Sequence, residues 1–423
     1  MTDTLASQGE GAALAPVPLD GAFLTEKSKL FWLAFWTGLL TVLTLGIYRF
    51  WARTRLRRYI WSAIDAGGDS FEYTGMGLEK FLGFLIALVV LAVYLGLLQV
   101  GLSFIGFNLW GAVTLEPSGA RDVLIQVGAT YVTGLAVLPL IFYAQYRSRR
   151  YMLSRTRWRG LRFGLDAAAW GYVWRALLYF ALSLVTLGLL IPLSTFRLEK
   201  YMTDRMWYGD AVFEQQGQWW GLYPAMKHLL IALGVLVLGG AVGYFGLARG
   251  LGAVILIAGS IWFLCGLVYY QVESFKYLSA HKVLDGTVRF TSNASSHRVI
   301  GIFVLGIILI AILTFVLSVV LGVLIGIVFA SGGSVMNGDG AGIGLFAGAG
   351  VAVALAAVLG YIAFLVLIGA LVTVFISAPI LGHYIDTLRV ENAQPLEQIN
   401  QRAGDRMADA DGFADALDIG GAF

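Results

Sequence analysis

The chain has 423 residues, of which 58% are hydrophobic and only 13% are charged. Soluble domains carry about 25% charged residues, so this composition excludes an ordinary soluble protein. A single cysteine, Cys265, excludes both an internal disulfide and a metal site built from several cysteines. The formal net charge is +3, and the charged residues are unevenly placed along the chain.

Residues 1–22 are mostly polar and small, and we expect them to form a disordered N-terminal segment. This segment lacks the basic residues that open a signal peptide. We therefore expect the internal apolar helices to drive insertion into the membrane.

Several apolar stretches reach the ~20 residues that a helix needs to cross the hydrocarbon core of a bilayer. The six clear stretches are 81–107, 123–143, 229–248, 251–270, 300–330 and 343–381. Two shorter stretches, 30–48 and 176–196, are borderline and resemble each other, because each contains Thr-Leu-Gly fifteen residues before a tyrosine. The glycine of that sequence gives a point at which a helix can stop or turn.

One short pattern recurs five times after hydrophobic stretches: a basic residue, a tyrosine, a glycine nine positions later and a phenylalanine three positions beyond the glycine. The near-constant spacing predicts a protein built by repeating one supersecondary unit. A faded fifth copy begins at Tyr384 and aligns Leu396 with the phenylalanine. The four clearer copies are Tyr59, Gly68 and Phe71; Tyr151, Gly160 and Phe163; Tyr201 and Phe213, with Gly209 one place early; and Tyr277, Gly286 and Phe290, with the phenylalanine one place late.

Short segments around the motif phenylalanines alternate in polarity, as in Asp-Ser-Phe-Glu-Tyr at 69–73. Alternation with aromatic and β-branched residues predicts a half-buried strand. A single strand leaves both of its edges unpaired, so we expect the copies to pair into small sheets beneath the membrane.

Two topologies fit the apolar stretches. If all eight cross the bilayer, the first two motif copies lie on one side and the last three on the other. If 30–48 and 176–196 instead enter and leave on the same side, every copy faces one side, and only Arg121 and Arg249 of the 29 Lys and Arg lie opposite. Because Lys and Arg collect in cytoplasmic loops, we favour six spanning helices, two re-entrant segments and cytoplasmic termini.

The predicted fold class is an all-α polytopic membrane protein with internal repeats, about six transmembrane helices, two re-entrant segments and short cytoplasmic β-strands. The predicted divisions are the disordered segment 1–22; two repeat units, 23–166 and 167–295, each with a re-entrant segment and a helix hairpin; a third hairpin with the last motif copy, 296–400; and an acidic C-terminal tail, 401–423.

Residues 39–48 read Leu-Leu-Thr-Val-Leu-Thr-Leu-Gly-Ile-Tyr, and they are followed by Trp51-Ala52, Arg58-Tyr59 and the segment Phe-Glu-Tyr-Thr-Gly at 71–75. This combination resembles the YjgN-like bacterial inner-membrane proteins, a family defined by a domain of unknown function. The resemblance is strongest over residues 20–110. It implies a multi-pass protein of the bacterial inner membrane, and it brings no catalytic residue.

No residue pattern indicates catalysis, and we predict a protein that is not an enzyme and has no cofactor or metal site. The four histidines lack metal-binding spacing, and the glycine-rich segments lack the lysine of a phosphate-binding loop. The centres of the six clear stretches hold essentially no ionisable residues. This pattern disfavours a carrier driven by protons or sodium, because such carriers place ionisable groups at mid-bilayer.

The basic residues beside the motif tyrosines are suited to anionic lipid headgroups, since each Lys or Arg near an anionic leaflet is worth about 1 kcal/mol. We therefore predict a component that interacts with membrane lipids or takes part in transport without ion coupling. As alternatives, these residues are topology signals alone, or the protein is a scaffold that recruits a cytoplasmic protein partner, or it is a lipid-modifying enzyme. No nucleic-acid partner is expected, and the oligomeric state is left open. The candidate headgroup residues are Arg55, Arg58, Arg147, Arg150, Lys200 and Lys276.

Overall fold

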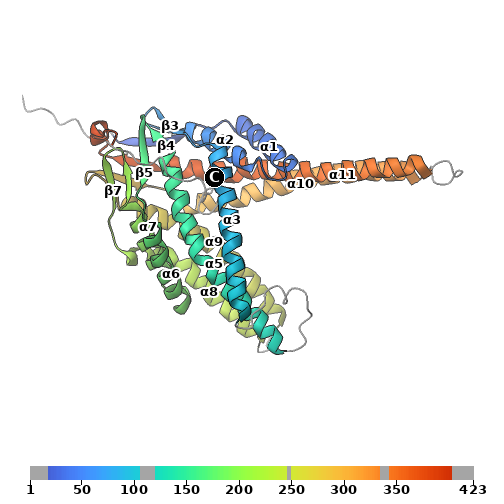
Figure 1. Ribbon diagram of the computed structural model, residues 1–423, viewed down its shortest axis with the longest axis horizontal. Helices are drawn as coiled ribbons and strands as arrows, with labels where there is room; N and C mark the ends of the chain where they lie inside the picture. Colours follow the sequence, from blue (N-terminus) through green and yellow to red (C-terminus); the bar gives the residue numbers. More distant parts are fainter. Residues whose placement is uncertain (1–17, 105–119, 245–248, 334–342, 403–423) are drawn as a thin grey trace, which may run out of the picture.

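The computed structural model describes residues 18–104, 120–244, 249–333 and 343–402 (Figure 1). Ten short strands close into one antiparallel barrel, in the order β1-β10-β9-β8-β7-β6-β5-β4-β3-β2. The strands are β1 (Leu19–Phe23), β2 (Ile64–Ala66), β3 (Asp69–Tyr73), β4 (Thr156–Trp158), β5 (Leu161–Leu165), β6 (Met206–Tyr208), β7 (Ala211–Gln215), β8 (Lys282–Leu284), β9 (Val288–Ser292) and β10 (Leu388–Glu391).

Helices connect the strands in pairs. They are α1 (Lys27–Leu43), α2 (Arg49–Ser62), α3 (Gly77–Phe104), α5 (Ala120–Ser154), α6 (Ala169–Val185), α7 (Ile191–Thr203), α8 (Tyr223–Tyr244), α9 (Arg249–Ala280), α10 (Ser296–Gly333), α11 (Ile343–Val372) and α12 (Ala378–Asp386). Shorter turns are the 3-10 helices η1 (Trp219–Leu222) and η3 (Gln394–Gln398) and a π-helical turn, η2 (Thr373–Ser377).

The repeated unit is a strand, a helical hairpin and a second strand. The described chain contains five such units: β1-α1-α2-β2, β3-α3-α5-β4, β5-α6-α7-β6, β7-α8-α9-β8 and β9-α10-α11-α12-β10. Each motif tyrosine lies near the end of the helix that returns to the barrel, and each motif phenylalanine of the four clear copies lies in the strand after the tight turn. The prediction of an internal repeat is therefore confirmed, and the five units correspond to the five copies of the motif.

The N-terminal strand closes the barrel. In β1, Leu19 pairs with Val390 and Asp20 with Arg389 of β10, while Gly21 pairs with Ala66 of β2. The Arg389 Nε lies 2.6 Å from Asp20 Oδ1 and reinforces this seam. The prediction that 1–22 are disordered is therefore wrong for residues 19–22, and residues 1–17 lie outside the described part of the chain.

The prediction that the copies pair into several small sheets is also wrong, because every strand of the described residues joins the same barrel. Closure satisfies both edges of every short strand, which three-residue strands could not achieve in isolated sheets. The fifth motif copy lacks a second strand of its own, because the barrel closes there onto the first strand of the chain. Its partner strand is β1, and Leu396 lies in η3, where it is buried against the barrel core.

The motif phenylalanines form the inside of the barrel. Phe71 stacks on Phe163 with ring centroids 6.1 Å apart, and Phe213 stacks on Phe290 at 6.0 Å. All four line a small apolar cavity of about 160 Å³ at the barrel centre. Burial raises the pKa of the neighbouring Tyr208 to about 12, so its hydroxyl stays protonated and donates to the carbonyl of Trp158 at 3.0 Å.

The motif glycines occupy the tight turns between paired strands. Gly68, Gly160 and Gly286 have φ of +88°, +77° and +69°, a region that side chains with a Cβ rarely adopt. A Cβ added at any of the three would meet no atom within 4 Å. The motif therefore requires glycine for its backbone conformation and not for space.

The two Thr-Leu-Gly sequences are helix reversals with the same geometry. Gly46 N donates to Thr41 O at 2.7 Å, and Gly188 N donates to Ser183 O at 2.7 Å. In both turns the leucine and the glycine have positive φ. This is the glycine-terminated helix end known as the Schellman motif, and it turns α1 into α2 and α6 into α7.

The α1–α2 and α6–α7 hairpins return to the barrel from which they start, so the topology with eight crossings is wrong. Within the described residues, six other helices are long and apolar enough to cross a membrane, and they lie in α3, α5, α8 with η1, α9, α10 and the α11–α12 region. The tips of the short hairpins are apolar and exposed, with Leu45 95% and Leu187 85% accessible. Such tips suit partial entry into the membrane.

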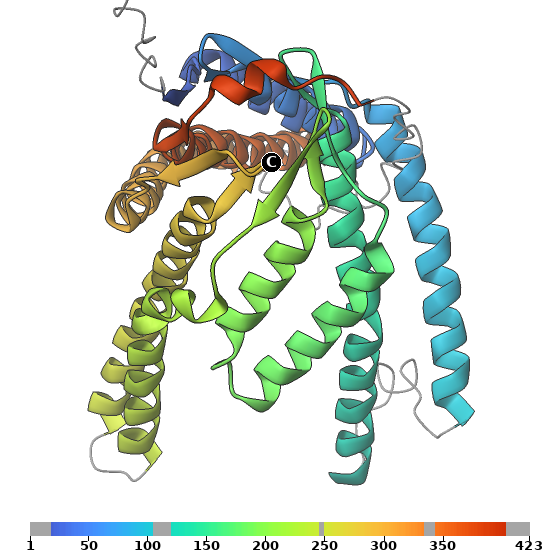
Figure 2. The same ribbon diagram turned by 90° about the vertical axis from the view of Figure 1, so that its left-hand side faces the viewer.

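The hairpins leave the barrel in different directions. Figure 2 shows α6–α7 between the α3–α5 and α8–α9 hairpins and ending short of both. In Figure 1, α10–α11 runs away from the barrel across the direction of the other long helices. One flat bilayer can contain all three long hairpins only if α10–α11 turns relative to the other two.

Candidate functional site

The motif tyrosines fasten each returning helix to a strand–helix connection. Tyr59 Oη accepts from Glu26 N and donates to Glu26 O, both at 3.1 Å, while Tyr201 Oη donates to Ala168 O at 3.0 Å. Tyr277 Oη likewise accepts from Gln218 N at 3.0 Å and donates to Gln218 O at 2.8 Å. Each backbone partner lies three residues beyond the end of β1, β5 or β7. Tyr151 instead donates to Glu79 Oε2 at 2.8 Å, and the Tyr384 ring packs against Phe275.

Three of the predicted headgroup residues bind the backbone at or just beyond the end of a strand. Arg58 donates to Gly75 O at 2.9 Å, Arg150 to Leu165 O at 3.1 Å and Lys200 to Gln215 O at 2.5 Å. These contacts give the basic residue of the motif a structural role. They leave its role toward lipid a prediction.

The other three predicted headgroup residues lie on the same helices or on α9. Lys276 Nζ is 3.3 Å from Glu273 Oε2. The guanidinium of Arg55 lies 5.6 Å from the Tyr48 ring, and that of Arg147 lies 6.0 Å from the Tyr143 ring. The six residues are therefore distributed around the base of the barrel and do not converge on one site.

A charged chamber lies where α5, α7, α8 and α9 meet the start of β8. Its volume is about 660 Å³, and its charged lining residues are Arg149, Glu199 and Lys282. Arg149 holds Glu199 with two nitrogen–oxygen contacts, of 2.7 and 2.9 Å, and Lys282 Nζ lies 3.2 Å from Glu199 Oε1. Two cations share one carboxylate, so this ion cluster carries a net charge of +1.

Burial and mutual attraction set the protonation of the ion cluster. Burial alone would raise the pKa of Glu199, but Arg149 and Lys282 outweigh it and hold that pKa well below the ordinary value. Burial lowers the pKa of Lys282, with Arg149 acting in the same direction and Glu199 opposing it. Glu199 is therefore ionised at neutral pH. Burial and the nearby Arg149 disfavour the charged form of Lys282, and Glu199 stabilises it.

The remaining lining of the chamber is mixed. Tyr270 Oη donates to Thr195 Oγ1 at 2.8 Å across the helices, which places a polar contact among aliphatic neighbours. The aliphatic and aromatic lining residues are Ile191, Leu229, Leu267, Phe275 and Leu278. The chamber can therefore accept an amphiphile with an anionic end.

Sequence reasoning missed the ion cluster, although one signal was present. Arg149 and Glu199 each stand two residues before a motif tyrosine, so the repeat places them at equivalent positions on neighbouring units. Lys282 stands five residues after Tyr277, at the start of the next strand. Among the described residues, no group of three or more His, Cys, Asp or Glu is arranged to hold a metal ion.

Comparison with known proteins places the chain in a family. The family model described as "Bacterial protein of unknown function (DUF898)" matches residues 18–315. The chain belongs to this family. The matched region begins just before β1 and includes the ion cluster, so the closing strand and the chamber lie within the family domain.

A curated relative is the inner membrane protein YjgN of Salmonella typhimurium (strain LT2), which is 26% identical over 154 residues. The match covers 36% of this chain and 33% of the relative, so the chain spans about a third of that relative's length. No solved structure matches the chain. Together with the six helices in the described part of the chain that are able to cross a membrane, these findings support an integral, multi-pass protein of the inner membrane, as the resemblance implied.

Proposed function

We propose that this protein is a non-enzymatic, lipid-interacting component of the bacterial inner membrane, and that the charged chamber binds an anionic lipid. The observation that carries the proposal is the net positive Arg149–Glu199–Lys282 cluster inside a chamber with apolar walls. A buried charge excess of this kind attracts a partner of opposite charge.

The chemistry of the lining matches a phospholipid better than a soluble anion. A phosphodiester carries one negative charge, which balances the net charge of the ion cluster. Arg149 and Lys282 can donate hydrogen bonds to phosphate oxygens, and the aliphatic lining would contact acyl chains. The chamber lies among helices predicted to be in the membrane, where such a ligand is abundant. The basic residues around the barrel base would add weaker attraction to the anionic leaflet.

Replacing Lys282 with Met tests the proposal, because it removes the charge excess and leaves the Arg149–Glu199 pair intact. The full-length protein would be reconstituted in nanodiscs of phosphatidylglycerol and phosphatidylcholine, and retained lipids would be counted by native mass spectrometry after extraction. We expect Lys282→Met to bind the phosphatidylglycerol of the chamber about tenfold more weakly than wild type, since a charged hydrogen bond is worth roughly 1.5–3 kcal/mol.

Three further variants serve as controls for this experiment. Arg197→Gln removes an exposed charge from the same helix as Glu199 and should leave retention unchanged. Arg55→Gln measures the weaker interfacial attraction. Deletion from Gln401 removes the acidic tail, and unchanged retention would separate lipid binding from partner recruitment. Equal retention of phosphatidylglycerol by wild type and Lys282→Met would refute the chamber as the lipid site.

A further inference from the structure

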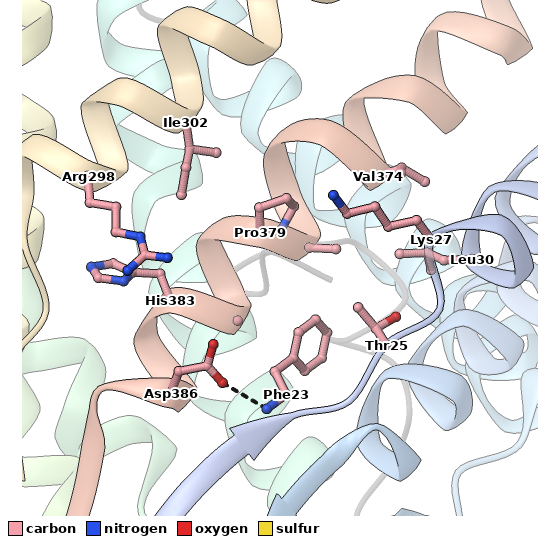
Figure 3. A pocket seen from close by; sticks show the side chains of 12 residues that line it. Phe23, Thr25, Lys27, Leu30, Arg298, Ile302, Val374, Pro379, His383 and Asp386 are labelled. Carbon is pink, nitrogen blue, oxygen red and sulfur yellow. Dashed lines mark hydrogen bonds between the residues drawn. The ribbon is translucent and has the colours of Figure 1, made fainter.

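We propose a second, separate site, which binds a phosphoryl group between the N-terminal connection and the third helical hairpin. The pocket has a volume of about 290 Å³ and lies between the β1–α1 connection, α10 and the η2–α12 segment (Figure 3). Its polar lining residues are Thr25, Lys27, Arg298, His383 and Asp386.

His383 presents a hydrogen-bond donor that has no acceptor. Its Nε2 accepts from Ser295 N at 2.9 Å, so in the neutral ring the proton is on Nδ1. Nδ1 is buried and has no hydrogen-bond partner among the described residues, and the residue is only 5% exposed. A buried donor in this condition calls for an acceptor in the adjoining space.

A second polar atom of the same pocket is in the same condition. Thr25 Oγ1 is buried and makes no hydrogen bond within the described chain. The two unsatisfied groups come from the two ends of the barrel seam, since Thr25 follows β1 and His383 precedes β10. One small ligand could satisfy both groups.

The charges around the pocket select an anion. Arg298 lies beside His383, and Lys27 reaches in from the opposite side (Figure 3). Neither cation makes an ion pair or hydrogen bond with a described residue. Among the described lining residues Asp386 supplies the one carboxylate, and its Oδ1 already accepts from Phe23 N at 2.8 Å. Two cations and one carboxylate leave the pocket with a net positive charge.

The size and walls of the pocket favour a phosphoryl group over a larger ligand head. Four donors surround the space: a guanidinium, an ammonium, an imidazole N–H and a hydroxyl. Tetrahedral phosphate oxygens can accept from several directions at once. The π-helical turn η2 forms one wall, and single π-turns inside helices occur frequently at functional sites. The phosphoryl group could belong to a free phosphate or to a lipid headgroup.

The test uses Arg298→Gln, because Arg298 is exposed and unpaired among the described residues, so its replacement should not disturb folding. Thermal unfolding of the full chain in detergent would be followed against inorganic phosphate, with sulfate-free chloride buffer at constant ionic strength. If the ligand is free phosphate, the unfolding midpoint of wild type rises with the phosphate concentration. Arg298→Gln then needs an about tenfold higher phosphate concentration for the same rise.

If the phosphoryl group belongs to a lipid, phosphate alone has no effect and the nanodisc assay decides. Wild type then retains one more phosphatidylglycerol than Arg298→Gln. Lys282→Met alters only the charged chamber and should bind at this pocket as wild type does. The two proposed sites are therefore tested independently. Arg289→Gln, an exposed barrel residue, is the matched control. If Arg298→Gln equals wild type in both assays, the proposal is overturned.

Discussion

Replacing Glu199 with Gln is expected to lower the free energy of unfolding by about 3–5 kcal/mol, because Arg149 and Lys282 would be left together without a counter-charge. The side chains of the ion cluster are only 18–29% exposed, so water can screen them little. Thermal or denaturant unfolding of the full chain in one detergent measures the effect. Glu214→Gln, which removes an exposed carboxylate from β7, should change stability by less than about 0.5 kcal/mol.

The pH dependence of this effect has a definite sign. The pKa of Glu199 is depressed in the folded state, so its stabilising contribution is complete above the ordinary value of 4.5 and is lost as the pH falls below it. The difference in stability between wild type and Glu199→Gln should therefore shrink as the pH falls below about 4.5. A difference that grew on acidification would show that Glu199 is not held as an ion by Arg149 and Lys282.

Removing the closing strand is expected to abolish the folded state. A chain that begins at Leu24 lacks β1, so β2 and β10 would each have an unpaired edge and the barrel would open at its seam. A chain that begins at Pro18 retains all ten strands and is the matched control. The measurement is the yield of monodisperse protein after membrane extraction, followed by its thermal unfolding.

We expect the chain beginning at Pro18 to match the full chain in yield and midpoint. The chain beginning at Leu24 should aggregate, or should unfold without a cooperative transition. Equal cooperative unfolding of the two truncated chains would show that β1 is dispensable and that the barrel is not closed by it.

The helices, the repeat and the helix reversals could be predicted from the sequence because their signals are local. Twenty consecutive apolar residues predict a spanning helix, and Thr-Leu-Gly at 44–46 and 186–188 marks the glycine-terminated ends. The motif glycines recur at a near-constant distance from the tyrosines, and they lie at tight turns because glycine adopts positive φ without the steric cost of a Cβ.

The closure of the barrel could not be predicted, because alternation along a strand says nothing about its partner. Asp20 and Arg389 are 369 residues apart in the chain, and β1 is a strand of only five residues. Strand pairing at such separation depends on the register that all five units impose together. The fifth copy was misaligned onto Leu396 because its true second strand comes from the other end of the chain.

The ion cluster was missed for a related reason. Arg149, Glu199 and Lys282 come from three units, with separations of 50 residues from Arg149 to Glu199 and 83 from Glu199 to Lys282. Linear spacing reveals sites within one helix or one loop, and this site is assembled by neighbouring units of a ring. The backbone partners of Arg58, Arg150 and Lys200 lie in or just after the first strand of the next unit, so their structural role was also not visible in linear spacing.

The central claim is that the five units form one ring closed by pairing of β1 with β10, and a disulfide across that seam tests it most directly. In a Cys265→Ser background, Asp20→Cys and Arg389→Cys would be combined, because these residues are direct partners in the antiparallel register. Partners of this kind have Cα atoms about 4.5–5.5 Å apart, which a disulfide can span.

The control combines Asp20→Cys with Glu214→Cys, which lies four strands away in the ring. We predict that mild oxidation in native membranes cross-links the first pair nearly completely and the second pair hardly at all. Absence of the Asp20–Arg389 cross-link, or equal cross-linking of both pairs, would contradict the closed ring.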